Sequence, residues 1–183
     1  MNAAHVHLLV NHLPIIGAML AVPLLALAAI RPKQRGLVIA VAVVLTLGAG
    51  GGGLALASGD AAEDLVERLP GVREDDIHAH EERAEVAIGF AVVAALASLV
   101  AAGLELDRGT PAPRSAVLGL LVLALANAGT MAWTGASGGV IRHTEIRAGG
   151  VPHAAERTNV RVMSRVSHQG GDAVGEHEPR VVR

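Results

Sequence analysis

The sequence predicts an all-α integral membrane protein that folds as a bundle of four transmembrane helices. Of its 183 residues, 51% are hydrophobic and only 17% are charged, and the mean hydropathy is +0.46, which is more apolar than an ordinary soluble domain. None of its apolar runs alternates like a barrel strand, so we expect helices, which satisfy their own backbone groups in lipid. Four runs each approach the ~20 residues that cross a hydrocarbon core, at residues 8–30, 37–57, 86–104 and 116–133.

The first apolar run also has the position and the Ala/Leu-rich composition of a signal peptide. It lacks the basic segment that opens a signal peptide. It is followed instead by a basic segment, residues 31–35, which resembles the flank of a stop-transfer sequence. We therefore expect the first helix to remain in the mature protein.

Basic residues in the short connections predict the orientation of the bundle. Arg31, Lys33 and Arg35 follow the first run, and Arg108 and Arg114 lie in the third connection. Short loops rich in Lys and Arg stay in the cytoplasm, so both termini should be extracytoplasmic. We expect a multi-pass protein of the inner (cytoplasmic) membrane, with the lipid bilayer as its first partner.

The second connection is the most charged part of the chain. Residues 60–69 carry apolar side chains at helical spacing and predict a short interfacial helix that ends at Pro70. The acidic residues 74–76 suit a helix N-terminus. A new helix should therefore begin there and continue into the third span.

The end of the chain is predicted to leave the membrane after the fourth run. Trp133 lies where an interfacial aromatic anchor is expected, and the glycine-rich residues 134–139 predict a turn. We expect a transmembrane domain over residues 1–147. Residues 148–183 should form a polar extracytoplasmic tail that is poorly ordered unless a partner holds it.

Several classes of function are disfavoured by the composition. The chain has no cysteine, which excludes disulfides, thiolate metal sites and covalent haem attachment. Its 15 basic and 17 acidic residues give no case for nucleic-acid binding. Nothing resembles an activated nucleophile or a carboxylate pair of defined geometry, so an enzyme is the least favoured class.

Histidines gather at the predicted outer face of the bundle. The predicted topology places all nine of them at that face or just inside it. On a continuous first helix, His5 and His12 share one face, whereas His7 points elsewhere. His12 should lie about 6 Å below the membrane boundary, because a helix rises about 1.5 Å per residue. His12 and His80 are therefore our preferred ligands.

The leading hypothesis is a site for a flat cofactor, preferably haem b. The macrocycle would pack on glycines of the second span, and the iron would take one imidazole from each of two helices. Amide and hydroxyl groups of the fourth span would fix a ring tautomer. The predicted cofactor-binding residues are His12, His80, Gly50, Gly51, Gly52, Gly53, Asn127 and Thr130.

Two other interpretations use the same part of the chain. Gly48 and Gly52 could form a small-xxx-small contact for close helix packing, in a small accessory subunit of a larger membrane complex that has no cofactor of its own. Alternatively, histidines and glutamates could bind Zn, Cu or Ni ions, which favour imidazole. Besides His12 and His80, the candidate metal ligands are His5, His7, His78, Glu82, His143 and Glu145.

Two short motifs resemble those of an uncharacterised family of four-helix bacterial membrane proteins. His7-x4-His12-x-Pro14 resembles the family's HPxxVHFP signature, and residues 134–140 resemble its GxxGGxLV segment. His80 matches a histidine that begins the third helix in that family. The resemblance covers residues 5–145 and implies haem binding. We therefore expect a haem-binding or metal-binding redox component that works with a redox partner or other membrane subunits.

Overall fold

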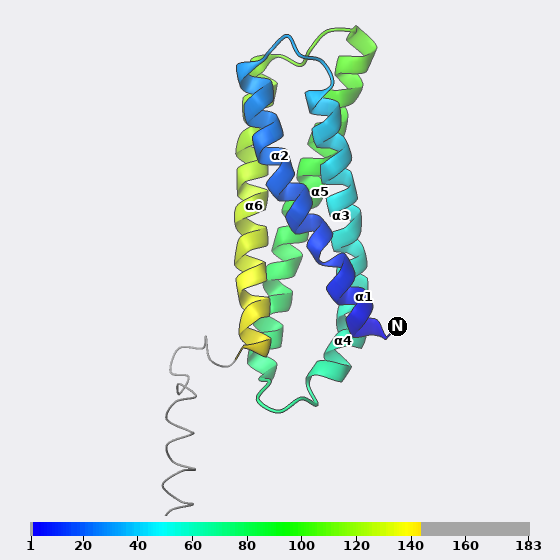
Figure 1. Ribbon diagram of the computed structural model, residues 1–183, viewed down its shortest axis with the longest axis vertical. Coiled ribbons are helices and arrows are strands. Elements are labelled where there is room, and N and C mark those ends of the chain that lie inside the picture. The colour runs from blue at the N-terminus through cyan, green and yellow to red at the C-terminus, as the bar shows by residue number, and fades with distance from the viewer. Residues whose placement is uncertain (1, 144–183) are drawn as a thin grey trace, which may run out of the picture. The chain divides into compact units, whose positions relative to one another are not determined.

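The computed structural model describes residues 2–143 as a bundle of helices (Figure 1). Helices α2, α3, α5 and α6 alternate in direction and form a ring, in which α2 and α5 each pack against both α3 and α6. The predicted all-α bundle is confirmed. In chain order the helices are α1 (Ala3–Val10), α2 (His12–Ile30), α3 (Leu37–Ala57), α4 (Gly59–Val66), α5 (Glu74–Arg108) and α6 (Arg114–Arg142).

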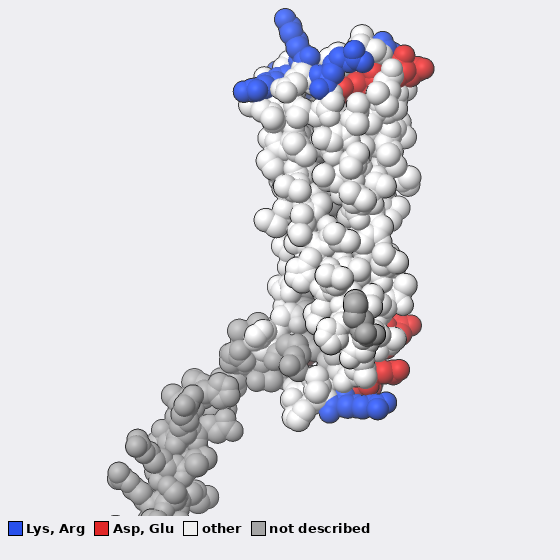
Figure 2. Space-filling model, turned by 45° about the vertical axis from the view of Figure 1, so that its right-hand side comes forward, with Lys and Arg blue, Asp and Glu red and all other residues white. Residues whose placement is uncertain are grey.

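Four helical stretches are long and apolar enough to cross a membrane. Figure 2 shows that charged side chains gather at the two ends of the bundle, while the wall between them is uncharged on the face shown. This distribution suits a multi-pass membrane protein. The four stretches are Ala3–Ile30, Leu37–Ala57, Glu74–Arg108 and Arg114–Ile141.

The side chains are sorted by size in the way that a lipid environment favours. Small residues are enriched where helices approach closely in membranes, whereas large apolar residues on the outside of a soluble protein would be exposed to water. Buried core residues include Ala21, Leu25, Ala94 and Ala124. Large residues on the outer surface include Met19, Leu47, Val100 and Val122.

A close backbone contact joins α2 to α3. A Cβ atom on Gly17 would lie 2.7 Å from the carbonyl oxygen of Val44 and 3.2 Å from the Cα atom of Gly48. A Cβ atom on Gly48 would lie 3.4 Å from the Cα atom of Pro14. The missing side chain of Gly17 is therefore needed for this approach, and Gly48 lies at the same contact between the two helices.

The first apolar stretch is interrupted at Asn11, which separates α1 from α2. Pro14 has no N–H to donate to the carbonyl of Val10, so the helical hydrogen-bond ladder is broken at this point. Proline is tolerated in the first turn of the new helix. The histidines before and after Asn11 therefore lie on two separate helices.

The fourth long helix extends further than the sequence predicts. The turn expected at residues 134–139 is wrong, because α6 continues to Arg142. The hydroxyl of Thr134 donates to the carbonyl of Arg83 on α5 at 3.0 Å, and the hydroxyl of Ser137 donates to the carbonyl of Thr134 at 2.7 Å. These contacts stabilise a helix that its glycines alone would weaken.

The two ends of the bundle contain different structural elements. Figure 1 shows both short connections at one end, and α1, α4, the start of α5 and the end of α6 at the other, which we call the histidine end. The predicted short helix and the helix start at Glu74 are confirmed as α4 and α5. The interfacial position of α4 stays a prediction, and the predicted tail at 148–183 lies outside the described residues.

A buried carboxylate joins the two short connections at the end opposite the histidine end. Glu105 is 3% exposed. It accepts hydrogen bonds from the backbone N–H of Gly36 at 2.9 Å and of Ala112 at 3.3 Å. Gly36 has a φ of 92°, a left-handed conformation that glycine adopts without a steric penalty. The carboxylate thereby links the α2–α3 and α5–α6 connections.

The Gly17 contact predicts a specific loss of stability. Gly17→Ala should lower the free energy of unfolding by about 1–3 kcal/mol, because the new Cβ meets backbone that cannot move aside easily. The control is Gly50→Ala, whose Cβ would meet nothing within 4 Å. Thermal unfolding in detergent, followed by circular dichroism, compares the two variants. Equal stability of both variants would contradict the packing role.

The Glu105 link predicts a second loss of stability. Glu105→Ala should lower the free energy of unfolding by about 2 kcal/mol, because two partly buried N–H groups lose their acceptor. Asp107→Ala changes an exposed carboxylate of the same helix and should leave stability nearly unchanged. Denaturant unfolding in detergent measures both, and a Glu105 variant as stable as the Asp107 variant would refute the link.

Candidate functional site

His7 is the α1 histidine that points toward the bundle. Its half-buried ring places Nδ1 2.9 Å from the carbonyl oxygen of Ala55 on α3. A carbonyl oxygen can only accept, so Nδ1 carries the proton and donates it. In the neutral imidazole the other ring nitrogen, Nε2, is then the acceptor.

His80 is held in the same tautomer by α6. Its Nδ1 lies 3.1 Å from both the carbonyl oxygen of Thr134 and the hydroxyl oxygen of Ser137. The Ser137 hydroxyl already donates to the Thr134 carbonyl, so the ring nitrogen must be the donor. A Cβ atom on Gly138 would lie 3.1 Å from Cε1 of the ring. The missing side chain of this glycine therefore leaves room for the imidazole.

His12, one of the two preferred ligands, does not point into the bundle. His12 is exposed. Its Nδ1 donates at 2.8 Å to the carbonyl of Leu8, four residues earlier in the chain. The buried positions of α2 include Pro14 and Ala21, which are seven residues apart and share one face. His12, on the same helix, does not fit this spacing. The structure thus does not bring His12 and His80 together in the interior.

His5 and His143 are exposed as well. Nδ1 of His5 lies 2.7 Å from the side-chain oxygen of Asn2, which also caps α1 by accepting from the backbone N–H of His5 at 3.0 Å. This bond gives His5 a local role at the helix start. His143 follows α6, and Glu145 lies outside the described residues.

The four consecutive glycines of α3 do not share a face that could receive a flat cofactor. Successive helical residues point in different directions. A Cβ on Gly51 would lie 2.5 Å from Cβ of Leu13, and one on Gly52 would clash with the side chain of Ile88. Gly50 and Gly53 are exposed on the other side. Helix packing takes up the space that the haem hypothesis assigns to Gly51 and Gly52, which do not fit that cofactor.

Asn127 and Thr130 do not contact the histidines through any hydrogen bond seen among residues 2–143. The hydroxyl of Thr130 donates to the carbonyl of Asn127 at 2.9 Å. The Asn127 side chain is 1% exposed, and its Oδ1 has no hydrogen-bond partner in the described part of the chain. The residues that orient His80 are instead Thr134 and Ser137. Sequence reasoning missed them, because it predicted a turn at residues 134–139.

A group of side chains that could hold a metal ion lies between α4 and α5. Glu63, His78 and Glu81 each offer a ligand atom, and these atoms lie within 4.8 Å of one another. We call this group the Glu–His–Glu triad. Sequence reasoning found His78 but missed Glu63, because only the packing of α4 near α5 brings it there.

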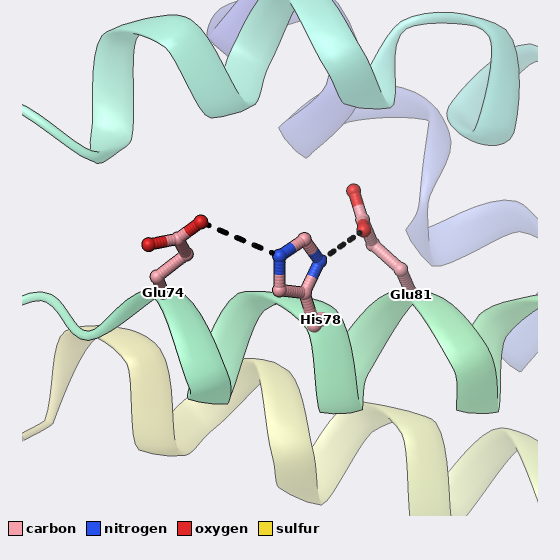
Figure 3. A network of polar contacts seen from close by, with 3 residues as sticks. All are labelled: Glu74, His78 and Glu81. Carbon is pink, nitrogen blue, oxygen red and sulfur yellow. Dashed lines mark hydrogen bonds and ion pairs between the residues drawn. The ribbon is translucent and has the colours of Figure 1, made fainter.

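Figure 3 shows that His78 lies between two carboxylates of its own helix. Its Nδ1 is 3.4 Å from Oε2 of Glu81, and its Nε2 is 3.6 Å from Oε1 of Glu74. The i+3 and i−4 spacings place these glutamates on the same side of the helix as His78. Glu82, the partner expected from the sequence, is exposed and is not part of the triad.

Burial and neighbouring acids raise the pKa of Glu63. Partial burial is the largest cause, followed by a hydrogen bond with Glu81 and the negative charges of Glu81 and Glu67, while His78 acts in the opposite direction. A carboxyl group near other carboxylates resists ionisation. A proton or a cation at this place relieves the repulsion.

Comparison with models of known protein families, with curated proteins and with solved structures finds no match for the chain. The resemblance to the four-helix membrane family therefore stays a prediction.

The raised pKa of Glu63 predicts how metal-free stability depends on pH. The folded state binds this proton more tightly than the unfolded chain does, whose carboxyl has an ordinary pKa of 4.5. The resulting stabilisation is complete below that value and is lost as pH rises through the pKa of the folded state. Glu63→Gln should remove this dependence. The melting temperature of the wild type minus that of the variant should therefore fall as the pH rises. Thermal unfolding from pH 4 to 8 in chelator measures it; a constant difference would contradict the pKa shift.

Proposed function

We propose that this multi-pass membrane protein binds a divalent transition-metal ion at the Glu–His–Glu triad. The observation that supports the proposal is the approach of three ligand atoms, from two helices, to within 4.8 Å of one another. One imidazole nitrogen with two carboxylate oxygens suits Zn²⁺, Mn²⁺ or Fe²⁺. An open coordination position would be filled by water.

The charges around the triad support a cation. Glu63 and Glu81 repel each other when both are ionised, and a divalent ion would neutralise them together. Nδ1 of His78 faces Glu81 and would ligate the ion, while Nε2 faces Glu74. A carboxylate beside the second ring nitrogen orients an imidazole ligand and raises its basicity. Glu74 would have this orienting role.

We further propose that the triad lies outside the cytoplasm, and the basic residues support this orientation. Arg31, Lys33 and Arg35 belong to a short connection at the end opposite the histidine end. By the preference of such loops for the cytoplasm, the histidine end would face outward in the inner membrane. With iron bound, the protein would be a redox component that exchanges electrons with a membrane partner. With zinc bound, the ion would join α4 to α5.

A structural role is the second candidate, and the packing at Gly17 and Gly48 supports it. Helices that pack closely through small residues suit an accessory subunit of a larger membrane complex. This role requires no metal at the triad. Metal binding therefore separates the two candidates.

Metal titration of the full-length protein in detergent tests the proposal. Isothermal titration with Mn²⁺ and Zn²⁺ should show binding that His78→Ala and Glu81→Gln weaken by about 10–100-fold. Binding should also weaken on acidification, because both ligand types must lose their protons. Glu82→Gln is the matched control, since it removes the adjacent, exposed carboxylate. Equal losses for the Glu81 and Glu82 variants, or no binding by wild type, would refute the triad.

A further inference from the structure

We propose that Arg83 and Trp133 form a binding site for the phosphate group of a phospholipid, in the membrane leaflet at the histidine end. The site lies on the outer surface of α5 and α6, which run side by side (Figure 1). It shares no residue with the Glu–His–Glu triad. It therefore stands independently of the function proposed above.

The arginine lies over the exposed indole ring. The Cζ atom of Arg83 is 4.9 Å from the centroid of the Trp133 ring, a distance at which a guanidinium and an aromatic face attract each other. Trp133 is 51% exposed. The hydroxyl of Thr134 donates to the carbonyl of Arg83 at 3.0 Å, which links the two helices at this level. Both α5 and α6 therefore position the guanidinium.

The guanidinium of Arg83 is available to an anion from outside the chain. Among residues 2–143, no carboxylate forms an ion pair with Arg83, whereas Arg73 pairs with two aspartates. An arginine that lies over a ring keeps the N–H groups at its edge, and their planar arrangement matches two oxygens of a phosphate. Arg83 can thus hold a phosphate while it remains on Trp133.

The position of Arg83 along α5 suits the headgroup region of a membrane. Arg83 comes shortly before residues 86–104, which carry no charge. The end of such a run marks the boundary between hydrocarbon and headgroups, where tryptophan is also enriched. The phosphate of a lipid would therefore lie at the level of Arg83.

The surface on the membrane side of this arginine is apolar. On α5, Val86 and Phe90 are exposed, and they follow Arg83 by three and seven residues, which places them on its side of the helix. On α6, Gly129 and Ala126 lie one and two turns below the indole and are exposed. A Cβ on Gly129 would meet nothing within 4 Å. These small residues leave room for an acyl chain.

A phospholipid fits this surface better than a free anion does. A free phosphate ion would use only the guanidinium and would leave the apolar residues uncovered. The exposed carboxylates of Glu82 and Glu85 would also repel an anion that arrives from water. A phospholipid, by contrast, already presents its phosphate at this level of the membrane.

Fluorescence quenching tests the site directly, because Trp133 is the only tryptophan of the chain. The full-length protein in a non-ionic detergent is titrated with phosphatidylglycerol or with diacylglycerol that carries the same brominated acyl chains. Bromine quenches tryptophan only at short range. Half-maximal quenching should need about fivefold less phosphatidylglycerol than diacylglycerol, since one basic side chain favours an anionic lipid by about that factor.

Two arginine variants separate the phosphate contact from the general charge of the protein. Arg83→Gln should make the two lipids equally effective, because the phosphate loses its partner. Arg73→Gln removes an arginine that already pairs with aspartates and should keep the preference. Each ratio is measured within one variant, so changes in the basal fluorescence of Trp133 cancel. Circular dichroism and gel filtration verify that each variant is folded.

Two further measurements concern the source of the phosphate and the role of charge. Inorganic phosphate should not reduce the preference relative to chloride of equal ionic strength, because the acyl chain is part of the ligand. If Arg83→Gln does not fold, the wild type decides. Raising the salt concentration from about 50 to 500 mM should lower its preference for phosphatidylglycerol, because salt screens exposed charges.

Five results would overturn the phospholipid site. The first is equal quenching of the wild type by both lipids, and the second is an unchanged preference in a folded Arg83→Gln protein. The third is a loss in Arg73→Gln as large as that in Arg83→Gln. The fourth is a selective loss in inorganic phosphate, which would indicate a site for soluble anions. The last is a wild-type preference that does not change with salt.

Discussion

The close approach of α2 and α3 at Gly17 and Gly48 determines which side of the first long helix faces the bundle. Because a Cβ on Gly17 would meet the backbone of α3, this face of α2 must point inward. Pro14 and Ala21 are buried on it. His7 belongs to the separate helix α1, and its inward position rests on its own contact with the carbonyl of Ala55 on α3.

The polar groups of the histidine end differ in how far they are buried. His7 and His80 are half-buried and take their hydrogen bonds from neighbouring helices. The Glu–His–Glu triad lies between α4 and the polar start of α5, with His78 exposed. Half-buried polar atoms of a membrane protein must find their partners within the protein, whereas the exposed ring of His78 is open to water. The two groups therefore differ in accessibility.

Much of the fold could be predicted from hydrophobicity and helix signals. The second span was expected at 37–57 and is observed at Leu37–Ala57, because its apolar run has sharp boundaries. The start of α5 at Glu74 was also correct, since acidic residues mark a helix N-terminus. These features depend on residues that are close together in the chain, so a single sequence is sufficient to predict them.

The errors concern contacts between segments distant in sequence. The glycines of residues 134–139 predicted a turn, but hydrogen bonds to Arg83 and His80 keep α6 helical there. Depth in the membrane favoured His12, although depth does not reveal which way a side chain points. The spacing of small residues along α2 carried that information. Glu63 could not be assigned to the triad from sequence, because its place depends on how α4 packs.

The most direct measurement of the central claim is the pulsed electron paramagnetic resonance spectrum of the protein loaded with one equivalent of Mn²⁺. This ion prefers oxygen ligands and so favours the triad over a pair of imidazoles. Metal binding at the triad predicts coupling of Mn²⁺ to a single imidazole nitrogen. This coupling should be lost in His78→Ala and kept in His80→Ala. A spectrum without nitrogen coupling, or coupling that survives in His78→Ala, would contradict it.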